Sequence, residues 1–173
     1  MKKLSTKQKL PHVLQDFIDR NKWEDEIEID DDSRSSRVST RMTIKNQEYR
    51  LFIETDDEKA YIKVFMYTPF NIPEKKITDA KLLVNEINNW LDVGRLSVVE
   101  ADGPFQYKGV VDVENSEPHH ALITNILAAA SGTFTVWGEA LGAVALTKKT
   151  AAEVLDEMKE ESRNAEQSVP DKL

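Results

Sequence analysis

Two aspartates in an acidic run of the chain have the spacing of the first oxygen ligands in a calcium-binding loop. Asp30 and Asp32 would begin such a loop, because its first carboxylate ligands stand two residues apart. The later positions do not fit: Arg34 replaces an oxygen ligand, Ser35 replaces the loop's glycine, and Arg41 replaces the closing glutamate. We therefore expect a solvated acidic surface here and no bound metal.

Two adjacent histidines are a second candidate for metal chemistry. His119 and His120 lie close in sequence to Glu114 and Glu117, and imidazole and carboxylate groups both bind zinc. Neighbouring positions on a helix point about 100° apart, so the two rings would not converge on one ion. The pattern favours a polar pair in the first turn of a helix.

No nucleophile or phosphate-binding motif indicates an enzyme. The chain contains no cysteine, which excludes thiolate nucleophiles and thiolate zinc sites. No serine lies in a G-x-S-x-G turn, and Gly138 and Gly142 fit neither the dinucleotide-binding nor the P-loop pattern. Acidic residues are numerous, but the sequence directs no pair of them to acid–base chemistry. We expect no catalytic residue and no cofactor.

Aromatic residues occupy the side of a predicted sheet that should be polar. The core-facing residues of one strand are Ile62, Val64 and Met66. Tyr61, Phe65 and Tyr67 must then face the opposite way, and Phe52 is expected to join them. Two interpretations stay open: a helix or a second subunit covers this face, or the face binds a segment of another protein. Aromatic side chains suit binding because they offer a large contact area with few rotatable bonds.

A helix over residues 77–91, followed by a hairpin, is the predicted centre of the fold. Apolar residues three and four positions apart give this helix one buried face. They are Ile77, Ala80, Leu83, Val84, Ile87, Trp90 and Leu91. Lys76 is expected on the solvent side, Gly94 at the end of the helix, and Asp102 and Gly103 in the turn of the hairpin.

The residues before this centre predict a helix and a three-strand antiparallel meander. Pro11 suits the first turn of the helix. A short edge strand with outward charges is expected within residues 21–32. From Arg37 onward, apolar and polar residues alternate, with turn signals near Asn46 and Asp57.

The remainder of the chain is predicted to be helical. Ser116 is expected to cap a first helix, which breaks at Ser131, and a second apolar segment then reaches Leu146. Thr150 and Glu153 have the spacing of a capping box and should begin a last, charged helix.

The apolar stretch over residues 121–146 raises the question of a membrane span. Asn125 and Glu139 interrupt it, so we expect a buried pair of helices and no membrane association. Gly138 and Gly142 allow close approach of a neighbouring element, in the core or, as we favour, at a subunit interface.

Length and charge limit the remaining classes. A chain of 173 residues suits one domain, which we place at residues 1–163, followed by a disordered tail at 164–173. The formal net charge of −8 argues against nucleic acid, because phosphate binding depends on clustered Lys and Arg. The absence of cysteine is compatible with a reducing cytoplasm, where we place the protein.

In the order of its elements, the chain resembles the bacterial YbjN family, whose fold is similar to that of type III secretion chaperones. The resemblance covers residues 37–155. It is carried by Val64 through Pro73-Glu74-Lys75, Val84-Asn85-Glu86-Ile87-Asn88, Gly94-Arg95-Leu96, Asp102-Gly103, Phe105-Gln106-Tyr107-Lys108 with Val110, and the segments 120–129, 140–145 and 150–155. It implies an α+β fold and a non-enzymatic, regulatory or chaperone-like protein that forms a homodimer.

Three functions follow as hypotheses. The first is a module that binds a protein partner through Phe52, Tyr61, Phe65 and Tyr67 or through an exposed strand edge. The second is an enzyme or small-ligand-binding protein with a site between the last helices and the sheet, near Trp137 and Glu139. The third is a regulatory subunit whose acidic segment, residues 24–32, meets a basic partner.

Overall fold

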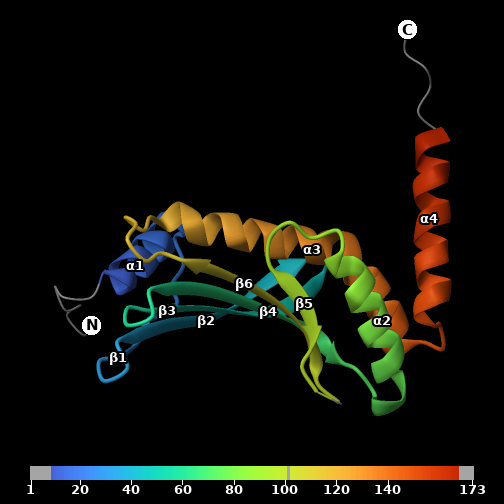
Figure 1. The fold of residues 1–173 in the computed structure, drawn as a ribbon, viewed down its shortest axis with the longest axis horizontal. Helices are drawn as coiled ribbons and strands as arrows, with labels where there is room; N and C mark the ends of the chain where they lie inside the picture. Colours follow the sequence, from blue (N-terminus) through green and yellow to red (C-terminus); the bar gives the residue numbers. More distant parts are fainter. Residues whose placement is uncertain (1–8, 101, 168–173) are drawn as a thin grey trace, which may run out of the picture.

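One six-stranded antiparallel sheet, ordered β1-β2-β3-β4-β6-β5, forms the body of the protein (Figure 1). The computed structural model describes residues 9–100 and 102–167. Its strands are β1 (Glu28–Asp30), β2 (Ser35–Ile44), β3 (Gln47–Asp56), β4 (Tyr61–Asn71), β5 (Arg95–Val98) and β6 (Pro104–Asp112). The predicted meander is β2-β3-β4, and the β5-β6 hairpin joins it because β6 pairs with β4.

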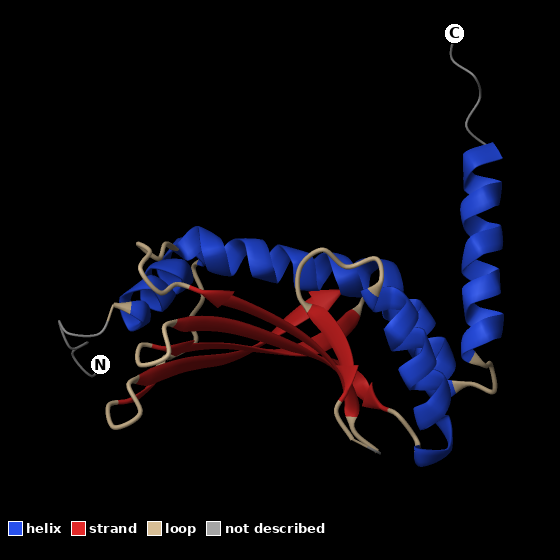
Figure 2. Cartoon of the chain, viewed as in Figure 1, coloured by secondary structure: helices blue, strands red, loops and turns tan. Residues whose placement is uncertain are grey.

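Within the residues that the structure describes, helices cover one face of this sheet. They are α1 (Leu10–Asn21), α2 (Ile77–Asn88), α3 (His120–Leu146) and α4 (Ala151–Gln167), and a 3-10 turn, η1 (Glu74–Lys76), precedes α2. Helices α1 and α3 lie along one side, whereas the other side carries no helix in the described part of the chain (Figure 2). The predicted α+β class and order of elements are confirmed, including the short edge strand β1.

Helix α2 keeps the predicted buried face but ends earlier than expected. Ala80, Leu83, Val84 and Ile87 are buried. Because the helix stops at Asn88, the helical period no longer holds at Trp90, which is 70% exposed; its predicted burial was wrong. Gly94 therefore does not end the helix. It precedes β5 with a φ of +71°.

Helix α3 is continuous, and the predicted helix pair was wrong. Ser131 lies within the helix, where its hydroxyl contacts the Met42 sulfur at 3.2 Å. The helix also begins later than expected, at His120, and the Ser116 hydroxyl instead donates to the Val113 carbonyl. Packing along the whole sheet outweighs the local break signal, because tertiary contacts supply most of a helix's stability in proteins.

By length and composition, α3 could cross a membrane, with a mean hydropathy of 1.3 and 39% of its most apolar window buried. Its packing explains the apolar sequence: Ile123, Ala130, Phe134, Leu141 and Val144 are each at most 1% exposed. A core helix of a folded domain requires such residues.

Two glycines of α3, Gly138 and Gly142, pack against residues of the sheet. A methyl group at Gly138 would lie 2.8 Å from the Tyr49 hydroxyl, and one at Gly142 would contact the Phe70 ring at 3.7 Å. Their small size serves close packing within the core, so the favoured subunit-interface interpretation was wrong for these two residues.

Helix α4 packs against the body through its first two turns, by Ala151, Val154, Leu155 and Met158, and then projects from it (Figure 1). The predicted capping box is confirmed: the Thr150 N–H donates to Glu153 at 2.8 Å, and the Glu153 N–H donates to the Thr150 hydroxyl at 3.3 Å. Lys76, expected in solvent, is buried and donates to the Lys149 carbonyl at 2.6 Å. The helix continues to Gln167, so the tail predicted from residue 164 was wrong for its first four positions; residues 168–173 lie outside the described part.

Candidate functional site

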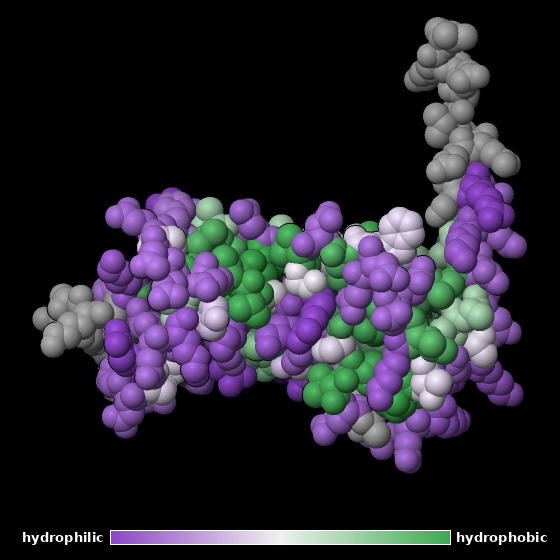
Figure 3. Space-filling view, viewed as in Figure 1, coloured by the Kyte–Doolittle hydropathy of each residue, from purple (hydrophilic) through white to green (hydrophobic). Residues whose placement is uncertain are grey.

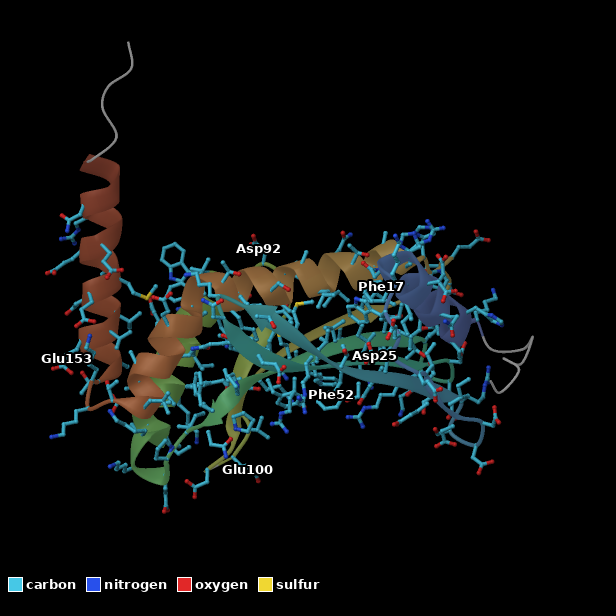
Figure 4. All side chains as sticks on the ribbon, turned by 180° about the vertical axis from the view of Figure 1, so that it is seen from behind. Phe17, Asp25, Phe52, Asp92, Glu100 and Glu153 are labelled. Carbon is cyan, nitrogen blue, oxygen red and sulfur yellow. The ribbon has the colours of Figure 1, made fainter. Side chains whose placement is uncertain are left out.

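The helix-free side of the sheet, hereafter the open face, carries the aromatic residues predicted for binding. Along β3 and β4, every second residue is buried against the helices, including Leu51, Ile53 and Val64 at 0% exposure. The residues between them point the other way; the aromatic ones are half-buried, whereas Glu48 and Arg50 are exposed. Figure 4 shows Phe52 on the side of the sheet away from α3.

Three of the four predicted residues form one cluster. Phe52 lies opposite Phe65 in the β3–β4 ladder, and the Phe52 and Tyr67 rings meet edge to face with centroids 5.6 Å apart. Tyr67 also accepts a hydrogen bond from the Gln106 amide at 2.6 Å. Tyr61 lies apart, at the end of the sheet.

Tyr61 lies between acidic residues. Its partners in the neighbouring strands are Asp56 and Asp112. Lys59 forms an ion pair with Asp56 at 3.2 Å. The pKa of Asp56 is lowered because the hydrogen bonds and charge of Lys59, together with Lys63, outweigh the opposing effect of desolvation. Asp56 therefore stays ionised at neutral pH and marks a polar margin of the open face.

A cation lies beside each ring of the cluster. The Arg37 guanidinium is 4.2 Å from the Phe52 centroid, Arg50 is 5.5 Å from Tyr67, and the Lys108 ammonium is 5.7 Å from Phe65. Such cation–π contacts at exposed sites contribute roughly 0.5–1 kcal/mol each. Sequence reasoning missed these cations. The outward positions of Arg37 and Arg50 follow from strand alternation, but Lys108 joins them only through the β4–β6 pairing.

The two histidines converge, contrary to the expected divergence. His119 is the N-cap of α3, outside the helical period, and its Nδ1 accepts from the Ala121 N–H at 3.3 Å. The two imidazole centroids lie 4.0 Å apart. His120 Nε2 is 3.9 Å from Asp16 in α1, so the acidic neighbour is Asp16 and not a nearby glutamate.

These three residues could supply one ligand atom each, all within 4.8 Å of one another. Each, however, is already engaged by protein groups: Asp16 accepts from Arg20 at 2.8 Å, and His119 caps the helix. The pKa of His120 is lowered, chiefly by desolvation and then by His119 and Arg20, against the opposing charge of Asp16. The cluster lies where α1 and α3 meet.

The site proposed between the last helices and the sheet is filled by protein. Tyr49, Phe134 and Leu141 occupy this layer and are each at most 1% exposed. Trp137 and Glu139 also diverge: Trp137 borders a surface groove, whereas Glu139 pairs with Lys45 at 3.1 Å. The expected geometry of a ligand site is therefore not present.

The groove at Trp137 lies between α3 and the segment that joins α2 to β5. Trp90, Val93 and Val136 border it and are 70%, 48% and 58% exposed. Apolar residues also gather along α3 and at the α2–β5 end of the molecule (Figure 3). This groove is a second surface at which a partner could bind.

The acidic residues near β1 form a turn. Asp30 accepts hydrogen bonds from the Asp32 and Ser33 backbone N–H groups at 3.0 and 3.3 Å, and from the Ser33 hydroxyl at 2.8 Å. Its carboxylate therefore closes the β1–β2 connection.

No family model matches the chain, and no curated protein matches it. Two solved structures are similar. A chain of the HopA1–SchA chaperone–effector complex is 17% identical with a TM-score of 0.53, and the match covers 79% of this chain and 99% of that chain. A chain of the ExsC–ExsE complex is 11% identical with a TM-score of 0.49, covering 76% and 95%. The protein thus has the α+β fold of type III secretion chaperones, as the sequence resemblance implied.

Proposed function

We propose that this protein is a chaperone-like, non-enzymatic module related to the YbjN family, and that it binds a polypeptide on the open face. The observation that carries the proposal is the half-buried cluster of Phe52, Phe65 and Tyr67 on a side of the sheet that no described helix covers. Burying these rings under a partner would remove apolar surface from water, at about 25 cal/mol per Å². Tyr61 lies at the margin of the contact.

The edge of β2 offers a second contact for the same partner. β1 pairs only with Ser35, Ser36 and Arg37, so the outer edge of β2 from Val38 to Ile44 has no strand partner within the described residues. An extended segment can add to such an edge by backbone hydrogen bonds. The fold shared with a chain of a chaperone–effector complex supports a polypeptide as the partner.

Affinity capture from the native host tests this function. The double variant Phe52→Ser, Phe65→Ser is compared with wild type and with Leu82→Ser, which removes an exposed apolar residue of α2 from another surface. We expect a protein that is captured by wild type and by Leu82→Ser but lost with the double variant. Equal capture by all three proteins, with circular dichroism confirming that each is folded, would refute binding at the open face.

We further propose that two copies associate through the groove at Trp90 and Trp137. The exposed Val93 and Val136 beside the two tryptophans make this the apolar surface best suited to a second copy. Sedimentation velocity should show a dimer for wild type and a monomer for Trp90→Glu. A dimer that persists in Trp90→Glu, Val136→Glu would place the interface elsewhere.

A further inference from the structure

Two neighbouring rows of the open face carry four cations and no carboxylate. One row is Arg41, Arg50, Tyr67, Gln106 and Ser97, and the other is Ser39, Phe52, Phe65, Lys108 and Arg95. The face as a whole is balanced, because Arg37 and Lys63 are accompanied by six carboxylates: Glu28, Asp30, Glu48, Glu54, Asp56 and Asp112. Positive charge is therefore concentrated in the two rows that hold the aromatic cluster, although the chain carries a formal net charge of −8.

Like charges stand directly opposite each other at two places on this face. Arg41 is paired with Arg50 in the β2–β3 ladder, and Arg95 is paired with Lys108 in the β5–β6 ladder. Like-charged residues opposite each other destabilise a sheet. The folded protein alone gains nothing from these two pairs, whereas a bound anionic group would turn both into favourable interactions.

Several of these cations lack a carboxylate partner. Glu48 pairs with Arg41 at 3.2 Å, and Glu54 lies 3.7 Å from Arg37. Arg50, Arg95 and Lys108 form no ion pair with any other residue that the structure describes. Arg50 and Arg95 are exposed, so their guanidinium groups are accessible to a partner.

We infer that the polypeptide bound on the open face is an acidic, extended segment. Its carboxylates would bind Arg50 on one side and Lys108 with Arg95 on the other, while apolar side chains between them contact Phe52 and Phe65. This inference rests on the proposed function and specifies its partner. Arg50 lies in β3 and Lys108 in β6, two strand spacings apart and offset by two residues along the strands. This places them about 12 Å apart, a distance that an extended chain spans in about four residues.

A single-stranded nucleic acid is the competing polyanion, and the ring geometry disfavours it. Bases bind to sheets by stacking on open aromatic faces. Here Arg37 lies over the Phe52 ring, and Arg50 and Lys108 lie over Tyr67 and Phe65. Carboxylates need only the guanidinium and ammonium groups, which remain accessible beside the rings.

Fluorescence anisotropy with three labelled probes tests the inference. The first probe is an extended peptide with Glu at about every fourth position and Leu and Ser between; the second carries Gln in place of each Glu; the third is an oligothymidylate. We expect the Glu peptide to bind wild type about tenfold more tightly than the Gln peptide, and high salt to reduce the difference.

The variant Arg50→Glu, Lys108→Glu should lose this preference. Its matched control, Lys75→Glu, Lys81→Glu, makes the same charge change at exposed positions away from the open face and should keep it. If the reversed variant does not fold, Arg50→Gln, Lys108→Gln replaces it. Equal binding of the Glu and Gln peptides, absent binding of both, tighter binding of the oligonucleotide, or an unchanged preference in the variant would each overturn the inference.

Different results would refute the two proposals. If capture of a protein depends on Phe52 and Phe65 but the Glu and Gln peptides bind equally well, the proposed function holds and the acidic nature of the partner is refuted. Capture that is insensitive to Phe52 and Phe65 would remove both.

Discussion

The carboxylate of Asp57 accepts a hydrogen bond from the backbone N–H of Leu10 at 3.2 Å, across 47 positions of the sequence. The same oxygen accepts from the Lys9 N–H at 3.0 Å. Lys9, the N-cap of α1, provides no side-chain cap of its own. The β3–β4 turn therefore supplies the acceptor that the first turn of α1 lacks, which fixes the helix on the sheet.

Removing this carboxylate should destabilise the protein. We expect Asp57→Ala to lower the free energy of unfolding by about 1 kcal/mol, the usual effect of losing a helix cap. Glu58→Ala, an exposed neighbour in the same turn, should change it by less than about 0.5 kcal/mol. Urea unfolding of both variants measures the difference, and equal midpoints would contradict the capping role.

Two glycines should respond to alanine in opposite directions. Gly94 has a φ of +71°, and a methyl group there would collide with the Tyr107 ring, so Gly94→Ala should cost about 1–3 kcal/mol. Gly132 lies within α3 and a methyl group there would meet nothing within 4 Å, so Gly132→Ala should stabilise by about 1 kcal/mol. Thermal unfolding compares them, and a shift of the same sign in both would refute this account.

Stability should decline at alkaline pH because of Tyr107. Burial raises its pKa from 10.0 to about 12, and its neutral hydroxyl donates to the Val93 carbonyl at 2.7 Å. Since the unfolded tyrosine ionises first, this contribution is complete below pH 10 and is lost as the pH rises towards 12, at about 1.4 kcal/mol per pH unit. Burial also raises the pKa of Tyr49, which adds a loss of the same sign.

Urea unfolding across this pH range measures the decline. Tyr107→Phe should be less stable at neutral pH but should show a shallower alkaline loss than wild type. An equally steep loss in Tyr107→Phe would assign the effect to other groups.

Sequence patterns predicted most of the fold because each strand of the meander buries one side. Alternation placed Phe52, Phe65 and Tyr67 on a common face, and the period of α2 identified its core residues. The capping box of Thr150 and Glu153 was equally predictable from the sequence, because its two residues lie close together in the chain.

Features that depend on distant parts of the chain could not be predicted from the sequence. Lys76 has the sequence context of a surface lysine but is buried where the α3–α4 connection places the Lys149 carbonyl beside it. The histidine pair converges because His119 caps α3 and α1 brings Asp16 to it. The concentration of cations around the aromatic cluster likewise needed the β4–β6 pairing, which brings Lys108 to Phe65.

Asn88 protects the free edge of β5, and its removal should expose that edge. Its side-chain amide donates to the Leu96 carbonyl at 3.0 Å and accepts from the Leu96 N–H at 2.8 Å, as a neighbouring strand would. Leu96 is 2% exposed, so the groups left unpaired in Asn88→Ala should cost about 1–3 kcal/mol.

Hydrogen exchange at the Leu96 amide measures this role directly. Exchange should accelerate in Asn88→Ala and stay unchanged in Asn89→Ala. The Asn89 side chain is exposed and donates a long hydrogen bond, 3.5 Å, to the Glu86 carboxylate. Light scattering of the Asn88 variant should also show more association, because an uncovered edge strand pairs readily with other chains. Unchanged exchange at Leu96 would mean that the packing of α2, and not the Asn88 amide, protects the edge.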